Sequence, residues 1–130
     1  MKRLLDTNAY VALKRNHQAV AELVRASTEI VFSTVVIGEL LFGFRNGDRF
    51  ERNAAELDAF LANPRVSVLA VTRTTADRFG RIAAALRKAG TPIPSNDIWI
   101  AAQAFESGTE VVTFDKHFEA VEGLVWTRPA

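Results

Sequence analysis

Residues 94–104 read PSNDIWIAAQA and predict the start of a helix. Ser95 and Asn96 carry side-chain oxygens that can cap a helix N-terminus, and Asp97 falls in the first turn, where the helix dipole favours a negative charge. Residues 98–105 then carry no charge at all. A helix that is apolar on every side is a buried helix. The pattern therefore predicts a central buried helix with a carboxylate at its N-terminus.

Strands and helices alternate on both sides of this central helix. Short apolar strands are predicted at residues 2–5, 29–32, 66–71 and 110–113, with a fifth at 124–126. Helical patterns cover residues 9–14, 17–27, 34–44, 49–62, 72–89 and, as a short turn, 116–120. Such alternation is typical of an α/β protein, in which a mainly parallel sheet of four to five short strands lies between two helix layers.

Local signals predict where two of the helices begin and end. Ser33 or Thr34 can cap the helix that follows the second strand, and Thr74 or Thr75 can cap the helix at 72–89. Gly90 then ends this second helix, because glycine readily adopts the left-handed backbone of a C-terminal cap.

Length and composition predict a single domain over residues 1–130, since the chain is 48% hydrophobic and can bury a proper core. The N-terminus shows no charged-then-apolar leader, and no uncharged run approaches the length of a membrane span. We therefore expect a soluble, cytoplasmic protein that makes no membrane contact. The chain has no cysteine and only two histidines, His17 and His117. Any metal ion must then be held mainly by oxygen atoms.

The charge balance is compatible with an acidic pocket in a basic surface. The chain has 16 basic and 15 acidic residues. If four acids met in one pocket, the remaining chain would carry 16 positive against 11 negative charges. Such a surface would suit a ligand with a phosphate backbone, but an ordinary mixed surface gives the same net charge.

Four acidic residues occupy matched places in the predicted sheet. Asp6 and Asp115 follow strands, Asp97 opens the central helix, and Glu39 is the one charge in the apolar helix after the second strand. Ligands of open parallel sheets bind beyond the carboxyl ends of the strands, and right-handed crossovers would bring these elements to that edge. Glu39 lies either at an exposed edge or beside a partner, because an unpaired buried charge is costly.

Four neighbouring carboxylates require a cation or shared protons. A single pair about 5 Å apart costs on the order of 3 kcal/mol at an effective dielectric constant of about 20. Oxygen ligands without histidine suit Mg²⁺ or Mn²⁺. Taken singly, each acid has a plainer interpretation: Asp6 and Asp115 as turn residues, Asp97 as an aid to the cap, Glu39 as an edge residue. The joint pattern favours a metal site.

The same residues carry a resemblance that covers nearly the whole chain. The four acidic segments resemble the motifs of PIN-domain nucleases, in particular the VapC toxins of bacterial toxin–antitoxin pairs: Leu5-Asp6-Thr7-Asn8, Glu39-Leu40, Asn96-Asp97-Ile98-Trp99 and Thr113-Phe114-Asp115-Lys116. Each motif alone is weak, but all four occur in the expected order and spacing.

The resemblance implies a PIN-like three-layer α/β/α fold and an endoribonuclease that depends on Mg²⁺ or Mn²⁺. It implies that the substrate is RNA, that a cognate VapB-type antitoxin neutralises the enzyme, and that the chain forms a homodimer. By motif match the metal-binding and catalytic acids are Asp6, Glu39, Asp97 and Asp115. Thr7 and Thr113 would orient these carboxylates, and Asn96 would be a cap or a secondary polar contact.

The resemblance also predicts how the antitoxin docks. We expect Tyr10, Val11, Val20 and Leu23 to form an exposed apolar groove beside the acids. An antitoxin segment would lay apolar residues along this groove and direct an Arg or Lys to the carboxylates.

Other conspicuous side chains favour ordinary structural roles. We assign His117 to packing or the surface, and Trp99 and Trp126 to the core rather than to base stacking. Three arginines near the Glu39 helix could contact phosphate, although an exposed helix face is the simpler interpretation: Arg45, Arg49 and Arg52.

Two other classes of function are alternatives. A receiver-type signalling domain has a similar length and an acidic Mg²⁺ pocket, but it needs paired acids after the first strand and a lysine after the last. Asp6 is instead followed by Thr7 and Asn8, and no lysine follows Trp126. A catalytically silent PIN-like module that only binds RNA is the second alternative, and the complete set of acids argues against it.

Overall fold

The computed structural model describes residues 1–130 and contains one five-stranded sheet whose neighbouring strands are all parallel. The strand order is β3-β2-β1-β4-β5. The strands are β1 (Lys2–Leu5), β2 (Glu29–Ser33), β3 (Val66–Leu69), β4 (Glu110–Val112) and β5 (Trp126–Thr127). The predicted α/β class with a mainly parallel sheet is confirmed, and each predicted strand is present within a few residues.

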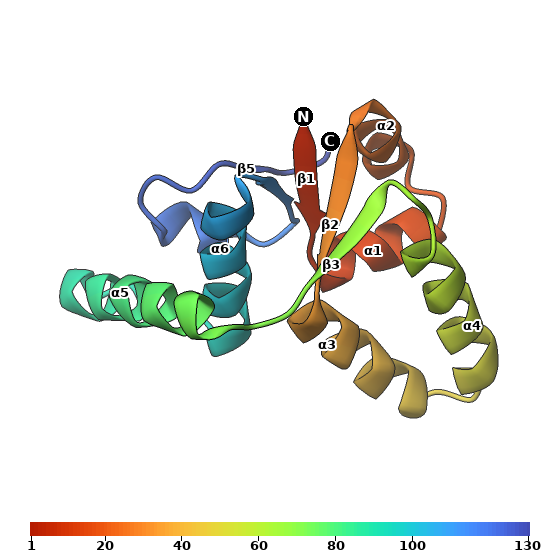
Figure 1. The fold of residues 1–130 in the computed structure, drawn as a ribbon, viewed down its shortest axis with the longest axis horizontal. Helices are drawn as coiled ribbons and strands as arrows, with labels where there is room; N and C mark the ends of the chain where they lie inside the picture. The colour runs from red at the N-terminus through yellow and green to blue at the C-terminus, as the bar shows by residue number, and fades with distance from the viewer.

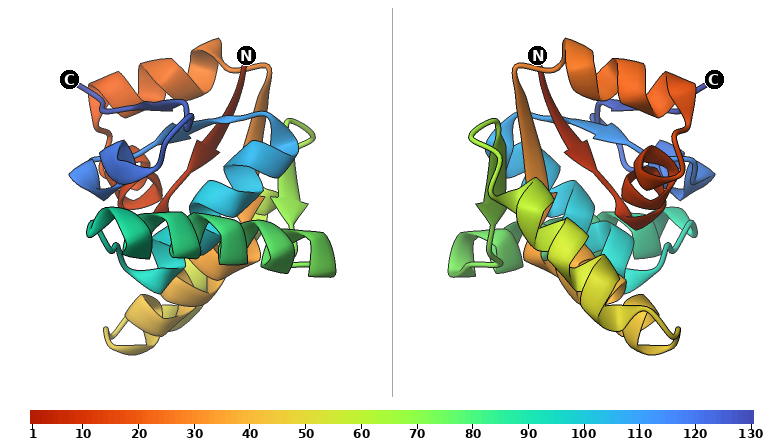
Figure 2. Two further views of the ribbon diagram at one scale, coloured as in Figure 1. Left: turned by 90° about the vertical axis from the view of Figure 1, so that its left-hand side faces the viewer. Right: turned by 90° about the vertical axis from the view of Figure 1, so that its right-hand side faces the viewer.

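Helices cover both faces of the sheet (Figure 1). They are α1 (Thr7–Lys14), α2 (Gln18–Ala26), α3 (Thr34–Arg45), α4 (Phe50–Leu61), α5 (Arg73–Ala89), α6 (Ser95–Ser107) and the short 3-10 helix η1 (Lys116–Ala120). Helices α5 and α6 lie on one side of the sheet, and α1, α2 and α4 lie on the other (Figures 1 and 2). Helix α3 extends beyond the carboxyl ends of the strands (Figure 1). None of these helices has the length and apolar character needed to cross a membrane.

The strand order creates a switch point beside the central strand β1. From β1 the chain builds β2 and β3 to one side, and it later returns to add β4 and β5 on the other. In open α/β sheets, ligands bind where the order reverses, outside the carboxyl ends of the strands. Asp6 directly follows β1 and Thr113 directly follows β4, so both residues lie at this point.

Part of the core lies between the sheet and α6, which explains the uncharged run found in the sequence. Residues 98–104 of α6 are buried except for Trp99, which stacks on Phe79 of α5 with ring centroids 4.1 Å apart. Trp99 is half-buried, and Trp126 packs against the same core. The predictions of a buried central helix and of structural tryptophans are confirmed.

Two predicted helix caps are wrong. The residue that caps α5 is Thr72: its hydroxyl accepts a bond from the Thr75 N–H (3.4 Å), while the Thr75 hydroxyl accepts one from the Thr72 N–H (3.0 Å). Helix α6 begins one residue earlier than predicted, with Pro94 at its N-cap and no side-chain cap. Ser95 and Asn96 therefore lie inside the first turn, where they cannot cap it. The Ser33 cap of α3 is confirmed, since its Oγ accepts from the Val35 N–H (3.0 Å).

Two glycines of α5 allow a matched test of helix architecture. Gly90 ends the helix with a left-handed backbone (φ 74°), so Gly90→Ala is expected to lower the free energy of unfolding by about 1 kcal/mol. Gly80 lies in the helix interior, and a Cβ there would meet nothing within 4 Å. Gly80→Ala should therefore raise the free energy of unfolding by about 0.5–1 kcal/mol. Urea unfolding of both variants checks this, and effects of the same sign would contradict it.

Candidate metal centre

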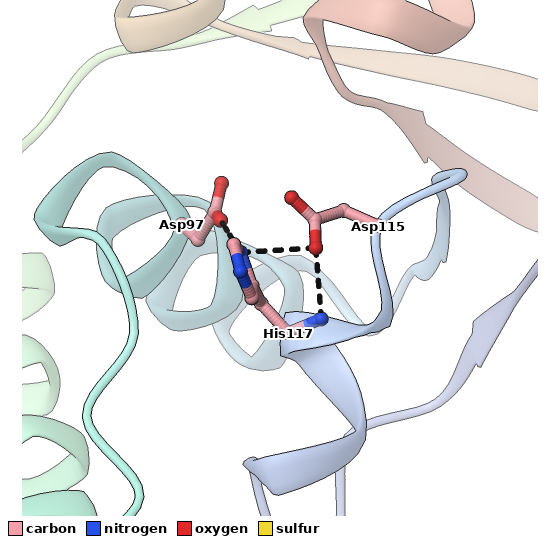
Figure 3. Close-up of side chains that lie close together, drawn as sticks. All are labelled: Asp97, Asp115 and His117. Atoms are coloured by element: carbon pink, nitrogen blue, oxygen red, sulfur yellow. Dashed lines mark hydrogen bonds and ion pairs between the residues drawn. The ribbon is translucent and has the colours of Figure 1, made fainter.

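Three side chains from two segments of the chain converge beyond the carboxyl end of β4: Asp97 from α6, and Asp115 and His117 from the start of η1 (Figure 3). The Nδ1 atom of His117 lies 3.3 Å from Oδ2 of Asp97 and 2.9 Å from Oδ1 of Asp115. One ligand atom from each residue can be chosen so that all three lie within 4.8 Å of one another. We call these three residues the acid–histidine group.

Local structure explains how His117 reaches the acids. Asp115 caps η1, and its Oδ1 accepts a hydrogen bond from the His117 N–H (2.9 Å). This cap turns the chain immediately after Asp115, so that the His117 ring faces back toward the carboxylates (Figure 3). The side chain is exposed, as the sequence suggested, but its assignment to mere packing or surface was incomplete. The sequence could have indicated this position, because His117 lies two residues after Asp115, and a capping aspartate commonly bonds the N–H two residues on.

Asp6 is buried close to this group. Only 6% of the residue is exposed, and its Oδ1 accepts a hydrogen bond from the Ala9 N–H (2.9 Å), which caps α1. Burial raises the pKa of Asp6 to about 6, and the negative charges of Asp97 and Asp115 push it further in the same direction. Hydrogen bonds from Thr113 and Ala9 oppose this rise. Asp6 is therefore a capping residue and, at the same time, a carboxylate held near two others.

Thr113 connects Asp6 to Asp115. Its hydroxyl oxygen accepts a hydrogen bond from the Asp115 N–H (2.9 Å), and the same side chain hydrogen-bonds Asp6. Thr113 is fully buried at the end of β4. Thr113 thus links the backbone of Asp115 to the side chain of Asp6.

The surroundings of Asp97 also disfavour its charge. Burial raises the pKa of Asp97, and the charges of Asp115 and Glu39 raise it further. The hydrogen bond and the charge of His117 oppose this rise. Electrostatic coupling thus links Asp97 to acids on two other segments.

Glu39 lies outside the acid–histidine group and is held by two hydrogen bonds. The Thr7 hydroxyl donates to Oε1 (2.6 Å), and the Asn96 side-chain amide donates to Oε2 (3.0 Å). Glu39 is half-buried, so it has partners rather than standing alone at an open edge. Asn96, which does not cap α6, instead joins α6 to α3.

The four acids lack basic partners. No Lys or Arg lies within ion-pair distance of Asp6, Glu39, Asp97 or Asp115, and His117 is the one basic side chain that contacts any of them. Neighbouring carboxylates without a Lys or Arg counter-charge fit a hard divalent cation. The donor set therefore fits a divalent metal ion, with Asp97 and Asp115 close together and Asp6 near them.

The predicted apolar antitoxin groove is wrong for two of its four residues. Tyr10 is 2% exposed, and Val20 is fully buried. Tyr10 packs edge-on against Phe32 and Phe60, with ring centroids 5.4 and 5.3 Å away. Tyr10 thus belongs to the core, because Phe32 of β2 and Phe60 of α4 pack on its ring, while Val11 and Leu23 are half-buried.

Comparisons with known proteins identify relatives of this chain. The sequence profile of the PIN domain matches residues 3–124. The chain is 33% identical over 127 residues to the ribonuclease VapC2 of Haemophilus influenzae, and 31% identical over 127 residues to the tRNA(fMet)-specific endonuclease VapC of Salmonella typhimurium. Each alignment covers 95% of both chains.

Solved structures show the same architecture. The chain superposes with a TM-score of 0.86 and 30% identity on a chain in the crystal structure of DNA-bound VapBC from Salmonella typhimurium, covering 98% of both chains. The VapBC-1 structure from nontypeable Haemophilus influenzae also gives a TM-score of 0.86, at 28% identity. The chain belongs to the PIN-domain family and, within it, to the VapC group.

Proposed function

We propose that this protein is the toxin of a toxin–antitoxin pair, an endoribonuclease that depends on Mg²⁺ or Mn²⁺ and is neutralised by a VapB-type antitoxin. The observation that carries the proposal is the convergence of Asp6, Asp97 and Asp115 at the switch point of the sheet without a Lys or Arg partner. The names of the relatives, which are ribonucleases and an endonuclease, support the choice of RNA as substrate.

Asp6, Asp97 and Asp115 would hold the metal ion, with Glu39 at the edge of the same site. Such an ion supplies a Lewis acid for the phosphodiester and lowers the pKa of bound water. The protein contributes the fixed positions of the acids. Thr113 forms hydrogen bonds with both Asp6 and Asp115, and Thr7 and Asn96 form hydrogen bonds with Glu39.

His117 lies beside two of the acids and offers them a ring nitrogen that can carry a proton. Its Nδ1 contacts both Asp97 and Asp115, and nearly half of its side chain is exposed. A neutral imidazole can accept a proton at one nitrogen, and a protonated imidazole offsets part of the charge of the two acids. His117 would thus compensate the acids when no metal ion is bound.

The protein partners follow from the same proposal. VapBC structures are assemblies named for two proteins, and we propose a VapB-type antitoxin as the partner of this chain. We also propose that residues 1–130 act as a single PIN domain and that two copies form a homodimer. Size-exclusion chromatography with light scattering, on the chain alone and co-expressed with the product of an adjacent small gene, tests both assemblies.

Chelation is expected to abolish cleavage of single-stranded or loop RNA by the purified protein. The acids repel one another and cannot stabilise a phosphodiester transition state without a cation. The measurement is gel-resolved RNA cleavage in Mg²⁺, in EDTA, and in EDTA followed by excess Mn²⁺. Cleavage that continues at full rate in EDTA would exclude the metal mechanism. An inactive Asp97→Asn protein, purified by the same procedure, would show that this cleavage does not come from a contaminating nuclease.

A further inference from the structure

A groove of about 620 Å³ lies between α1, α3 and α4. Its lining includes Thr7 and Glu39, which hydrogen-bond each other at the edge of the candidate metal centre. The groove therefore adjoins the acids. Two of the helices that form it, α1 and α4, lie on the opposite side of the sheet from α5 and α6 (Figure 1).

The walls of this groove are basic. Four cationic side chains line it, all of them exposed: Lys14, Arg15, Arg49 and Arg52. The acidic lining consists of Glu39, which belongs to the candidate metal centre, and Glu56, which pairs with Arg52 (3.4 Å). The other three cations form no ion pair with any carboxylate.

The groove also has apolar lining residues. Tyr10 and Leu40 are each only 2% exposed, whereas Val11 and Phe44 are half-buried. The Nζ of Lys14 lies 5.8 Å from the ring centroid of Tyr10 and 5.7 Å from that of Phe60. Exposed cations that lack carboxylate partners and line a groove suit a polyanion.

We propose that this groove binds the sugar-phosphate backbone of the RNA on one side of the cleaved bond, with Arg15 and Arg49 as the main phosphate contacts. The inference rests on the proposed function and extends it to the path of the substrate. Arg15 ends α1 and Arg49 precedes α4, so the two guanidinium groups come from separate segments of the groove. Each is free of competing carboxylates and can contact phosphate oxygens through two N–H groups.

The test compares two double variants of equal charge. Arg15→Gln/Arg49→Gln removes two groove cations, and Arg87→Gln/Lys88→Gln removes two exposed cations of α5, so each lowers the formal net charge from +1 to −1. Binding of a fluorescent single-stranded RNA is measured in EDTA across a salt series, so that binding is scored without cleavage. Circular dichroism verifies that both variants fold.

The groove variant is expected to raise the Kd about tenfold near 0.1 M salt. The slope of log K against log salt should also become less steep by about 1.4, because two phosphate contacts are removed and each contributes about 0.7 on a single strand. The α5 variant should stay within about twofold of the wild type. Equal weakening by both variants, or by neither, overturns the groove assignment.

Cleavage and partner binding separate the remaining outcomes. If the groove variant binds RNA normally but no longer associates with the antitoxin, the groove is a protein-binding site and the proposal is wrong. If the wild type cleaves RNA in Mg²⁺ but the groove variant binds and cleaves equally well, the proposed function stands and the groove assignment fails. If RNA binds through the groove but is never cut in Mg²⁺ or Mn²⁺, the groove stands and the proposed nuclease function fails.

Discussion

Asp97→Asn is expected to reduce RNA cleavage by about a hundredfold or more while leaving the fold intact. Asn has nearly the same shape as Asp, and Asp97 caps no helix. The substitution removes a charge and a hard ligand, while an Asn side chain can still form a hydrogen bond with His117. A bound metal ion contributes several kcal/mol of transition-state stabilisation, and each 1.4 kcal/mol corresponds to a factor of ten in rate. Loss of one of its nearest carboxylates should therefore be severe.

Stability distinguishes this explanation from a structural one. Burial and neighbouring charges raise the pKa of Asp97, so its ionised form is unfavourable in the folded protein. Asp97→Asn should leave the free energy of unfolding in EDTA unchanged or higher. Asp77→Asn is a matched control, because Asp77 is an exposed residue of α5 paired with Arg81 (3.1 Å). It should retain full cleavage. An Asp97→Asn protein that melts early yet cuts RNA at the wild-type rate would contradict the assignment.

The sequence predicted the positions of the acids because those positions depend on the order of elements. Asp6 directly follows β1, and Asp115 lies close after β4. Parallel strands bring their carboxyl ends to one edge, so an acid placed after an apolar run is located by the topology itself. The buried α6 followed from an equally simple signal, its uncharged run.

Side-chain partners could not be predicted in the same way. The hydrogen bonds of Glu39 to Thr7 and Asn96 join residues that are 32 and 57 positions apart, and they depend on how α3 packs against α1 and α6. The contact of His117 with Asp97 spans 20 positions and requires the turn made by η1. Periodicity within one element carries no information on such distances.

The exposure of α1 was mispredicted for a related reason. Tyr10 is amphipathic, and the sequence alone allows its ring to face either a partner or the core. In the fold, Phe32 from β2 and Phe60 from α4 enclose the ring. Burial and the charge of Glu56 raise the pKa of Tyr10 to about 12. Only the tertiary arrangement decides between these environments, and it leaves exposed basic side chains along the neighbouring groove.

Asp6→Asn is expected to stabilise the metal-free protein, and to do so more strongly as pH rises. The pKa of Asp6 is about 6 in the folded protein against an ordinary value of 3.8, so folding favours the protonated carboxyl. Below about pH 4 the carboxyl is protonated in both states and contributes no penalty. Between these two values the unfolded chain ionises first, so stability falls as pH rises, and the full penalty is present above pH 6. Its magnitude is on the order of 1–3 kcal/mol.

The measurement is denaturant unfolding of Asp6→Asn and wild type in EDTA from pH 4 to pH 8. The difference in free energy of unfolding should be near zero at the acid end and should grow to its full value by about pH 7. Asn keeps an oxygen for the Ala9 N–H, so the cap of α1 survives and does not offset the gain. Asp58→Asn, at an exposed position of α4, is the control and should change stability by less than about 0.5 kcal/mol.

Mg²⁺ should reverse the order of stability, so that the wild type becomes more stable than Asp6→Asn. A ligand that binds only the folded state stabilises it by mass action, by about 2.7 kcal/mol at a hundred times its Kd. The wild type would gain this stabilisation because its ionised Asp6 helps to hold the ion, whereas Asp6→Asn would bind the ion weakly and gain little. An Asp6→Asn protein that is less stable than wild type in EDTA at pH 8, yet gains as much from Mg²⁺, would show that Asp6 serves only as the cap of α1.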